Sequence, residues 1–280
     1  MKYSLSVLSL LFGLFVCVTV FSACGGGDEP SSGGNNGGSS NNNSTPNNNS
    51  TPSTPQSTKH IAKIITEEGS SFYESSFTYD SQGRVIKVTE TQSGTGTNSH
   101  SETEYQYGEM LIISKMKGEG TYSNGQSFTR TESHSYTLEN GRIVKDEEKQ
   151  GSSLNSTSSS RTDTFSYDAN NYLSSINTTM LTWSDGNLIK LGDRSFEYSN
   201  DPWVKGFPLH LESSNMDANL FAIGYYGNIP KNLPSKTIAS ETSGYTYDYT
   251  FEGSYVTKAV ITPFVENNKS HKSISTIIWE

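Results

Sequence analysis

Short segments of alternating apolar and polar residues, separated by turns, make up most of the chain after residue 59. Phe77 and Tyr79 alternate with polar residues, and Val85 opens the next apolar run. Asp80 can accept a hydrogen bond from a backbone N–H two residues further on, and Gly83 can adopt the positive φ that closes a short hairpin. This segment therefore predicts two antiparallel strands joined by a tight turn.

The same pattern recurs down the chain, which indicates a structural repeat. Its further copies are 105–111, 136–144, 165–173 and 181–189. Asn140-Gly141 in the second of these favours a type I′ turn, and Asn171 stands where other copies have glycine. Longer polar, glycine-rich connections separate the copies, so we expect the tight turns at one edge of a sheet and the long loops at the other.

Alternation predicts many strands and one interruption. The predicted strands are 60–67, 71–79, 84–91, 101–107, 110–116, 127–138, 142–148, 161–167, 172–176, 180–183, 187–191, 194–198, 236–241, 245–251, 255–262 and 273–279. Prolines and glycines in 201–234 indicate a small irregular insertion with a short helix, which Asn215 or Asp217 could cap. The predicted fold class is all-β, an antiparallel hairpin or meander array in a curled sheet. The pattern does not decide whether that sheet is open or closed.

Amino-acid composition indicates how the two faces of the sheet are packed. The 16 tyrosines and the low aliphatic content fit a sheet with one packed face and one wetter face. A membrane β-barrel is an alternative, because alternation and abundant tyrosine suit it. Charged strand segments argue against it, and we interpret Asp146, Glu147 and Glu148 as a solvated strand end.

Two resemblances follow from these residues. Tyr79-Asp80 with Gly83-Arg84, and in part Tyr167-Asp168, resembles the YD repeat of Rhs-type proteins, which implies long antiparallel sheets. Residues 60–280, ending their insertion in Lys231-Asn232-Leu233-Pro234, are similar to a family of Bacteroides-type lipoproteins of unknown function. That family has no assigned catalytic residues, so the resemblance implies none here.

The N-terminus indicates export and lipidation. Lys2 precedes an apolar stretch of signal-peptide length, and Phe21-Ser22-Ala23-Cys24 is a lipobox. We therefore expect a signal peptide over 1–23, diacylglycerol and palmitate on Cys24, a disordered linker up to residue 58, and a single all-β domain over 59–280. The linker has a root-mean-square span of roughly 30 Å, so it can hold the domain clear of the lipid.

The mature chain is expected at the cell surface and without thiols. Asp28-Glu29 resembles the signal that sends Bacteroides-type lipoproteins to the exterior of the outer membrane, with the periplasmic face as the alternative. Cys17 leaves with the signal peptide and Cys24 carries lipid. Disulfides, a cysteine nucleophile and a Cys-His metal site are therefore excluded.

The net charge and the absence of known motifs limit the ligands and reactions that this chain could serve. The net charge of −9 argues against nucleic acid as a partner, and no phosphate-binding or dinucleotide motif occurs. His210-Leu211-Glu212 is the best metal candidate, but a third ligand is not identifiable, so we expect neither metal nor cofactor. Asp80, Asp168 and Asp185 are explained as turn residues. No pair of acids can be placed at catalytic separation, so a glycan hydrolase is less favoured and we expect no enzyme.

Aromatic residues are the best functional lead. Trp203, Phe207, Tyr225 and Tyr226 lie in the irregular insertion, where exposed rings could stack on a sugar or anchor a protein interface. The tyrosines at 245, 247 and 249 fit a half-buried sheet face instead. The sequence thus favours a non-catalytic binding module for a glycan or protein, anchored to the membrane through Cys24. The alternative is a structural component of an envelope complex that pairs through exposed sheet edges.

Overall fold

The structure is a computed structural model that describes residues 59–94, 96–154, 158–208, 215–265 and 271–280. The predicted signal peptide, Cys24 and the linker lie outside the described residues. So does the metal candidate His210-Leu211-Glu212.

Strands dominate the described residues. They are β1 (Ile61–Glu68), β2 (Ser71–Tyr79), β3 (Val85–Ser93), β4 (Thr97–Tyr107), β5 (Leu111–Tyr122), β6 (Ser127–Glu139), β7 (Arg142–Ser152), β8 (Ser159–Tyr167), β9 (Leu173–Ile176), β10 (Thr179–Ser184), β11 (Asn187–Leu191), β12 (Arg194–Pro202), β13 (Asn232–Ser240), β14 (Ser243–Glu252), β15 (Tyr255–Val265) and β16 (Ser273–Trp279). Each coincides with a strand predicted from alternation, with ends that differ by up to six residues, as at the end of β5.

The strands form a closed barrel. Every strand pairs antiparallel with the next one in the chain, and β1 pairs with β16, placing Ile64 opposite Ile277. The expected antiparallel meander is therefore confirmed, but the sheet is closed and not only curled. Closure gives every described strand a neighbour on both sides, although β8 pairs with β9 only over Phe165–Tyr167. The structural alternative, in which exposed edges pair with a partner, stays a prediction.

The tight turns have the chemistry that the sequence predicts. Asp80 Oδ1 accepts hydrogen bonds from the backbone N–H groups of Gln82 and Arg84, at 2.9 and 3.0 Å. Gly83 has a φ of 74°. Both residues of the Asn140-Gly141 pair have positive φ, 52° and 76°, as a type I′ turn requires.

Five of these hairpins share an irregularity that the sequence did not reveal. One residue near the start of the outgoing strand is skipped in the pairing, which is a β-bulge. In the β6–β7 hairpin Leu138 pairs with Ile143, but Thr137 pairs with Lys145, so Val144 is the extra residue. Because side chains alternate with a period of two, each bulge reverses which of the following residues face inward.

This reversal corrects the interpretation of Asp146, Glu147 and Glu148 as a solvated strand end. Asp146 and Glu148 are only 3% and 6% exposed. Glu147 alone faces outward, where its Oε1 lies 3.0 Å from Lys145 Nζ. The bulge at Val144 thus places two carboxylates inside the barrel.

Seven aromatic side chains bind backbone carbonyls of the neighbouring strand. In each case the aromatic residue lies at the middle or toward the end of one strand, and the carbonyl lies at or near the start of the strand before it. The donor–acceptor pairs are Tyr79–Ile61, Tyr107–Val85, Tyr167–Ile143, Trp183–Leu173, Tyr198–Leu188, Tyr249–Pro234 and Trp279–Val256. We call these seven bonds the aromatic ties. They explain why the aromatic and aliphatic positions recur at fixed places in the repeat.

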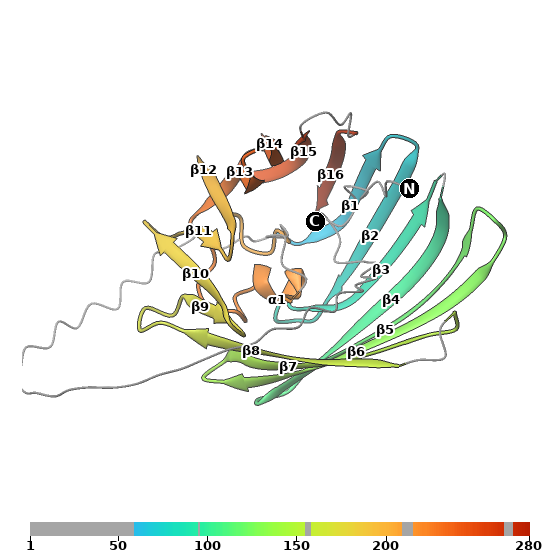
Figure 1. The fold of residues 1–280 in the computed structure, drawn as a ribbon, viewed down its shortest axis with the longest axis horizontal. Coiled ribbons are helices and arrows are strands. Elements are labelled where there is room, and N and C mark those ends of the chain that lie inside the picture. The colour runs from blue at the N-terminus through green and yellow to red at the C-terminus, as the bar shows by residue number, and fades with distance from the viewer. Residues whose placement is uncertain (1–58, 95, 155–157, 209–214, 266–270) are drawn as a thin grey trace, which may run out of the picture. The chain divides into compact units, whose positions relative to one another are not determined.

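The insertion between β12 and β13 lies inside the ring of strands, where Figure 1 shows its helix, α1 (Ala218–Ala222). Asp217 caps this helix, since its Oδ1 accepts from the N–H groups of Asn219 and Leu220 at 2.9 and 3.1 Å. The expected insertion with a short helix is therefore confirmed, and of the two predicted caps, Asn215 and Asp217, it is Asp217 that caps it. No helix in the described segments has the length and hydrophobicity that a membrane crossing needs.

The hydrophobic core lies between the inner face of the strands and this insertion. Phe165 of β8 packs edge-on against Tyr226 with ring centroids 5.1 Å apart, and Trp203 packs in the same way against Phe221 at 6.1 Å. Apolar surface buried in this way supplies the main driving force for folding. The insertion therefore fills this part of the barrel interior with apolar side chains.

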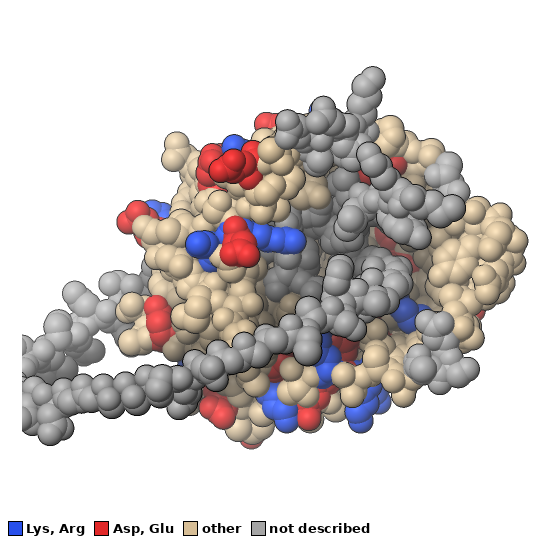
Figure 2. Space-filling view, in the orientation of Figure 1, with Lys and Arg blue, Asp and Glu red and all other residues tan. Residues whose placement is uncertain are grey.

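The outward face of the wall carries charged pairs between neighbouring strands. Lys63 Nζ lies 2.7 Å from Glu74 Oε1, and Lys87 Nζ lies 2.8 Å from Glu102 Oε1. Basic and acidic groups alternate along the lower edge of the molecule in Figure 2, where Figure 1 places β6–β8. These pairs place charge on the outward face of β1–β4.

Candidate functional site

A pocket of about 220 Å³ opens at the end of the barrel that carries the tight turns. Its wall combines the residues around the start of β1, the β2–β3 hairpin, the insertion and Trp279 of β16. Closure of the barrel creates it, because His60 and Glu280 exchange backbone hydrogen bonds of 2.8 and 2.9 Å where the first and last strands meet.

Aromatic rings form one side of the pocket. Tyr79 stacks on His60 with ring centroids 4.6 Å apart, and Tyr225 stacks on Tyr107 at 5.8 Å. The aromatic ties hold Tyr79 and Trp279 in place by their polar ends. Rings held rigidly at the wall of a cleft offer flat apolar faces on which a sugar ring or another flat group can stack.

Three cations line the same pocket: Lys59, Arg84 and Lys205. No Asp or Glu belongs to the described lining. Arg84 is fixed in place, with its guanidinium 4.4 Å from the centroid of the Tyr107 ring and its Nη2 2.6 Å from Asp80 Oδ2. Burial alone would lower the pKa of Arg84, but its bonds to Asp80 and Tyr225 raise that pKa, so the group stays charged.

Two acidic residues, Asp80 and Glu280, lie next to residues of the pocket lining without belonging to it. Asp80 forms the ion pair with Arg84. Burial raises the pKa of the Tyr79 hydroxyl, and the charge of Glu280 adds to this shift. The described lining itself holds three cations and no acid. In a chain of net charge −9 this lining favours an anionic ligand group.

The four aromatic residues of the insertion that were predicted to bind a ligand differ in exposure. Trp203, Phe207 and Tyr226 are 1%, 3% and 0% exposed, so the expectation that their rings are available at the surface is wrong. They are buried because the insertion lies inside the barrel and supplies its core. Only Tyr225 is half-buried and lines the pocket. Tyr225 thus remains a candidate ligand-binding residue.

No sequence pattern indicates that the cations of the pocket lie together. Arg84 lies in the Gly-Arg pair of the repeat, which was explained by the turn alone. Lys59 and Lys205 lie about 150 residues apart in sequence, and only the closed barrel with its internal insertion brings them together. The Gly83-Arg84 pair was the one available signal, because Gly83 also lines the pocket.

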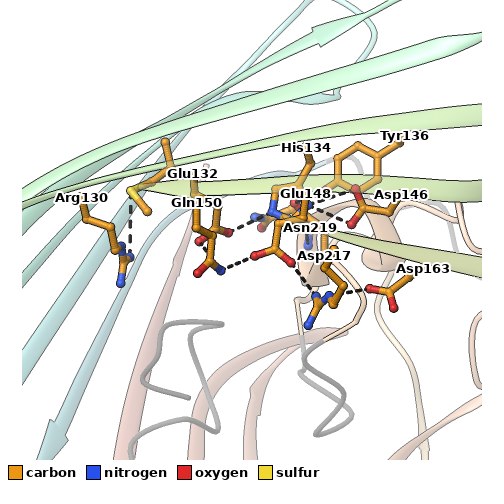
Figure 3. Close-up of polar contacts among 12 residues, drawn as sticks. Arg130, Glu132, His134, Tyr136, Asp146, Glu148, Gln150, Asp163, Asp217 and Asn219 are labelled. Carbon is orange, nitrogen blue, oxygen red and sulfur yellow. Dashed lines mark hydrogen bonds and ion pairs between the residues drawn. The ribbon is translucent and has the colours of Figure 1, made fainter. Parts of the chain in front are cut away.

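A second set of polar groups projects from the inner face of β6, β7 and β8, as Figure 3 shows. Glu132 and His134 come from β6, Asp146 and Glu148 from β7, and Arg161 from β8. Residues two apart on a strand share a face, and His134 lies opposite Glu148 in the register. The sequence pattern does not single out His134, because the bulge at Val144 hides which of its neighbours face inward.

Carboxylates surround the His134 ring. Nδ1 lies 2.8 Å from Asp146 Oδ2, and Nε2 lies 2.9 Å from Glu132 Oε1. Burial alone would lower the pKa of His134, but these two hydrogen bonds outweigh it and raise the pKa to about 10. Arg161 in turn binds Glu148 Oε2 at 2.8 Å. The inner wall therefore holds a connected network of acidic and basic groups.

The fold and its pocket define a class of protein: a closed antiparallel β-barrel with a helix inside and a cationic, aromatic pocket at one end. Residues 77–259 match the family described as "Domain of unknown function (DUF4595) with porin-like fold", and the chain belongs to this family. Its expected membership in a family of unknown function is thereby confirmed.

A porin-like protein from Bacteroides vulgatus, known from a crystal structure, is similar to this chain with 12% sequence identity and a TM-score of 0.30. The similarity covers 79% of this chain and 99% of the other. No match is found among curated proteins.

Proposed function

We propose that this chain is a lipoprotein of the outer membrane, anchored through Cys24, that binds an acidic glycan without catalysing a reaction on it. The observation that carries the proposal is the pocket, where fixed aromatic rings and three cations line the same cavity. Rings stack on the apolar faces of sugars, and guanidinium and ammonium groups bind carboxylates. A uronic or sialic acid combines both features.

The size of the pocket limits the ligand. Small-molecule sites usually measure about 300–1,000 Å³, and this pocket is smaller, at about 220 Å³. It therefore suits one sugar unit or the end of a longer chain. Lys205 and Lys59 are exposed at its rim, where a longer glycan would continue.

The anchor at Cys24 is proposed from the lipobox, and the hydrophilic outer wall supports it. Lys63–Glu74 and Lys87–Glu102 place charges on the outward face. A wall of this kind does not need lipid around it, so the protein would reach the membrane through its N-terminus. The linker then lets the pocket sample the space above the bilayer.

The test is a glycan screen with the full-length chain in detergent, followed by calorimetry on the best acidic ligand and its neutral counterpart. Lys205→Ala and Tyr225→Ala should each weaken binding about tenfold or more, which is about 1.4 kcal/mol. Lys190→Ala, a change of an exposed lysine outside the pocket, is the matched control and should leave affinity unchanged. Neutral and acidic glycans binding equally well would refute the role of the cations.

The same preparation tests the alternative of a structural envelope component. A partner that co-purifies in stoichiometric amount, together with no glycan binding, would favour that alternative. Saturable binding that is lost in Lys205→Ala and kept in Lys190→Ala would favour the glycan pocket.

A further inference from the structure

The inner wall of the barrel carries three side chains arranged as ligands of one ion. Glu132, His134 and Glu148 each offer one donor atom, and these three atoms lie within 4.8 Å of one another. We propose that these residues bind a divalent transition-metal ion of the Zn²⁺ type. The site shares no residue with the pocket at the tight-turn end, so it stands independently of the proposed glycan binding.

The strand register builds this set. Glu132 and His134 are two residues apart on β6 and therefore face the same side, toward the lumen (Figure 3). His134 lies directly opposite Glu148 on β7. Glu148 faces inward only because of the bulge at Val144. Three ligands thus come from two hydrogen-bonded strands of a closed wall, which holds their backbones at fixed spacing.

Asp146 orients the imidazole for this role. Its Oδ2 lies 2.8 Å from His134 Nδ1, and its side chain is 96% buried. A carboxylate on one ring nitrogen keeps a proton there, so that the other nitrogen can bind a metal once it has released its own proton, which is the usual arrangement behind a metal-bound histidine. The Nε2 atom points at Glu132 Oε1, 2.9 Å away. A metal ion would take the position of the proton between these two atoms.

The remaining contacts hold both oxygens of Glu148, and Gln150 also donates to Glu132 Oε2 at 3.5 Å. Arg161 Nη2 lies 2.8 Å from Glu148 Oε2, and Gln150 donates to Oε1 of the same carboxylate. The side chains of Glu132 and His134 are 17% and 15% exposed, so an ion can reach them from the lumen. Around one Zn²⁺ ion the donors would lie about 3.3 Å apart, so small side-chain rotations of the two glutamates complete the site.

The donor set selects the kind of ion. One imidazole nitrogen and two carboxylate oxygens suit Zn²⁺ and neighbouring first-row ions, whereas Ca²⁺ takes six to eight oxygens and rarely imidazole. Three protein ligands leave at least one position open toward the lumen.

The experiment is isothermal titration of the metal-free full-length chain with Zn²⁺, and separately with Ca²⁺. We expect one Zn²⁺ per chain. His134→Gln and Glu132→Gln should weaken Zn²⁺ binding about 100-fold, and Asp146→Asn about 10–100-fold because it orients the ligand without touching the ion. His100→Gln changes an exposed histidine on β4 and should bind as the unchanged chain does.

Circular dichroism and thermal unfolding of each metal-free variant identify any that fail to fold. Glu132→Gln keeps the shape of the side chain, so it keeps the test valid if His134→Gln is unstable. Absence of saturable Zn²⁺ binding would overturn the proposal. It would equally be overturned by unchanged affinity in both folded ligand variants, or by Ca²⁺ binding as tightly as Zn²⁺.

Discussion

The hydroxyl of Tyr105 donates a hydrogen bond to Asp217 Oδ2 at 2.8 Å, which joins the barrel wall to the cap of the internal helix. The two residues are 112 positions apart in sequence. The other oxygen of Asp217 caps α1. A single buried carboxylate therefore fixes both the start of the helix and its place against β4.

Replacing that carboxylate should destabilise the fold strongly. Asp217→Ala removes the helix cap, worth about 0.5–2 kcal/mol. It also leaves the Tyr105 hydroxyl without this partner, at a further cost of about 1–3 kcal/mol. We expect the free energy of unfolding to fall by about 2–4 kcal/mol in urea denaturation. Asp248→Ala, at an exposed position on β14, should stay within about 0.5 kcal/mol, and equal losses in the two variants would contradict the role of Asp217.

The aromatic ties should each stabilise the barrel through one hydrogen bond. Tyr167→Phe keeps the ring under the Arg142 guanidinium, 4.5 Å away, but leaves the carbonyl of Ile143 without its donor. The expected loss is about 1–2 kcal/mol of unfolding free energy. Tyr122→Phe, whose ring packs on Phe128 outside the aromatic ties, is the matched control and should change stability by less than about 0.5 kcal/mol.

The Asp80 turn should make part of the stability pH-dependent. Burial alone would raise the pKa of Asp80, but hydrogen bonds from Arg84 and Gln82 lower it below its ordinary value of 3.8. A carboxyl with a lowered folded-state pKa stabilises the fold above its unfolded pKa, and this contribution is lost as the pH falls through the folded pKa.

Asp80→Asn should therefore be less stable than the unchanged chain at pH 7, by about 0.5–1.5 kcal/mol, and the gap should shrink as the pH is lowered below 3.8. Denaturation curves at several pH values measure it. Ser81→Ala in the same turn should show no pH-dependent difference. A gap that stays constant between pH 7 and strongly acidic conditions would mean that the charge of Asp80 contributes nothing.

Local patterns were sufficient to predict the strands and turns, because each depends on residues close in sequence. Alternation located the strand that ends at Tyr79, and Asp80 with Gly83 located its turn. Closure could not be predicted in this way, since the pairing of Ile64 with Ile277 joins opposite ends of the domain and has no local signal. The placement of the insertion inside the barrel follows from closure and was missed with it.

The functional residues were harder to predict for two physical reasons. A bulge such as that at Val144 breaks the period of two, so counting from Ile143 assigns Asp146 and Glu148 to the wrong face. Aromatic residues in an irregular segment have the same sequence signature whether they bind a ligand or fill a core. Tyr225 and Tyr226 are adjacent, yet one lines the pocket and the other is buried.

Substitutions of Trp203 and Tyr225 should affect different properties, the first mainly stability and the second mainly ligand binding. Trp203 is 1% exposed and packs against Phe221 in the core, so Trp203→Ala should lower the free energy of unfolding by about 3–5 kcal/mol. Tyr225 is half-buried, and its backbone carbonyl still accepts from Ile143 N–H after substitution. We therefore expect Tyr225→Ala to cost only about 1–2 kcal/mol while it weakens binding of the acidic glycan. Urea denaturation and calorimetry on both variants measure the two effects. If Trp203→Ala remained as stable as the unchanged chain, the placement of the insertion as the core of the barrel would be wrong.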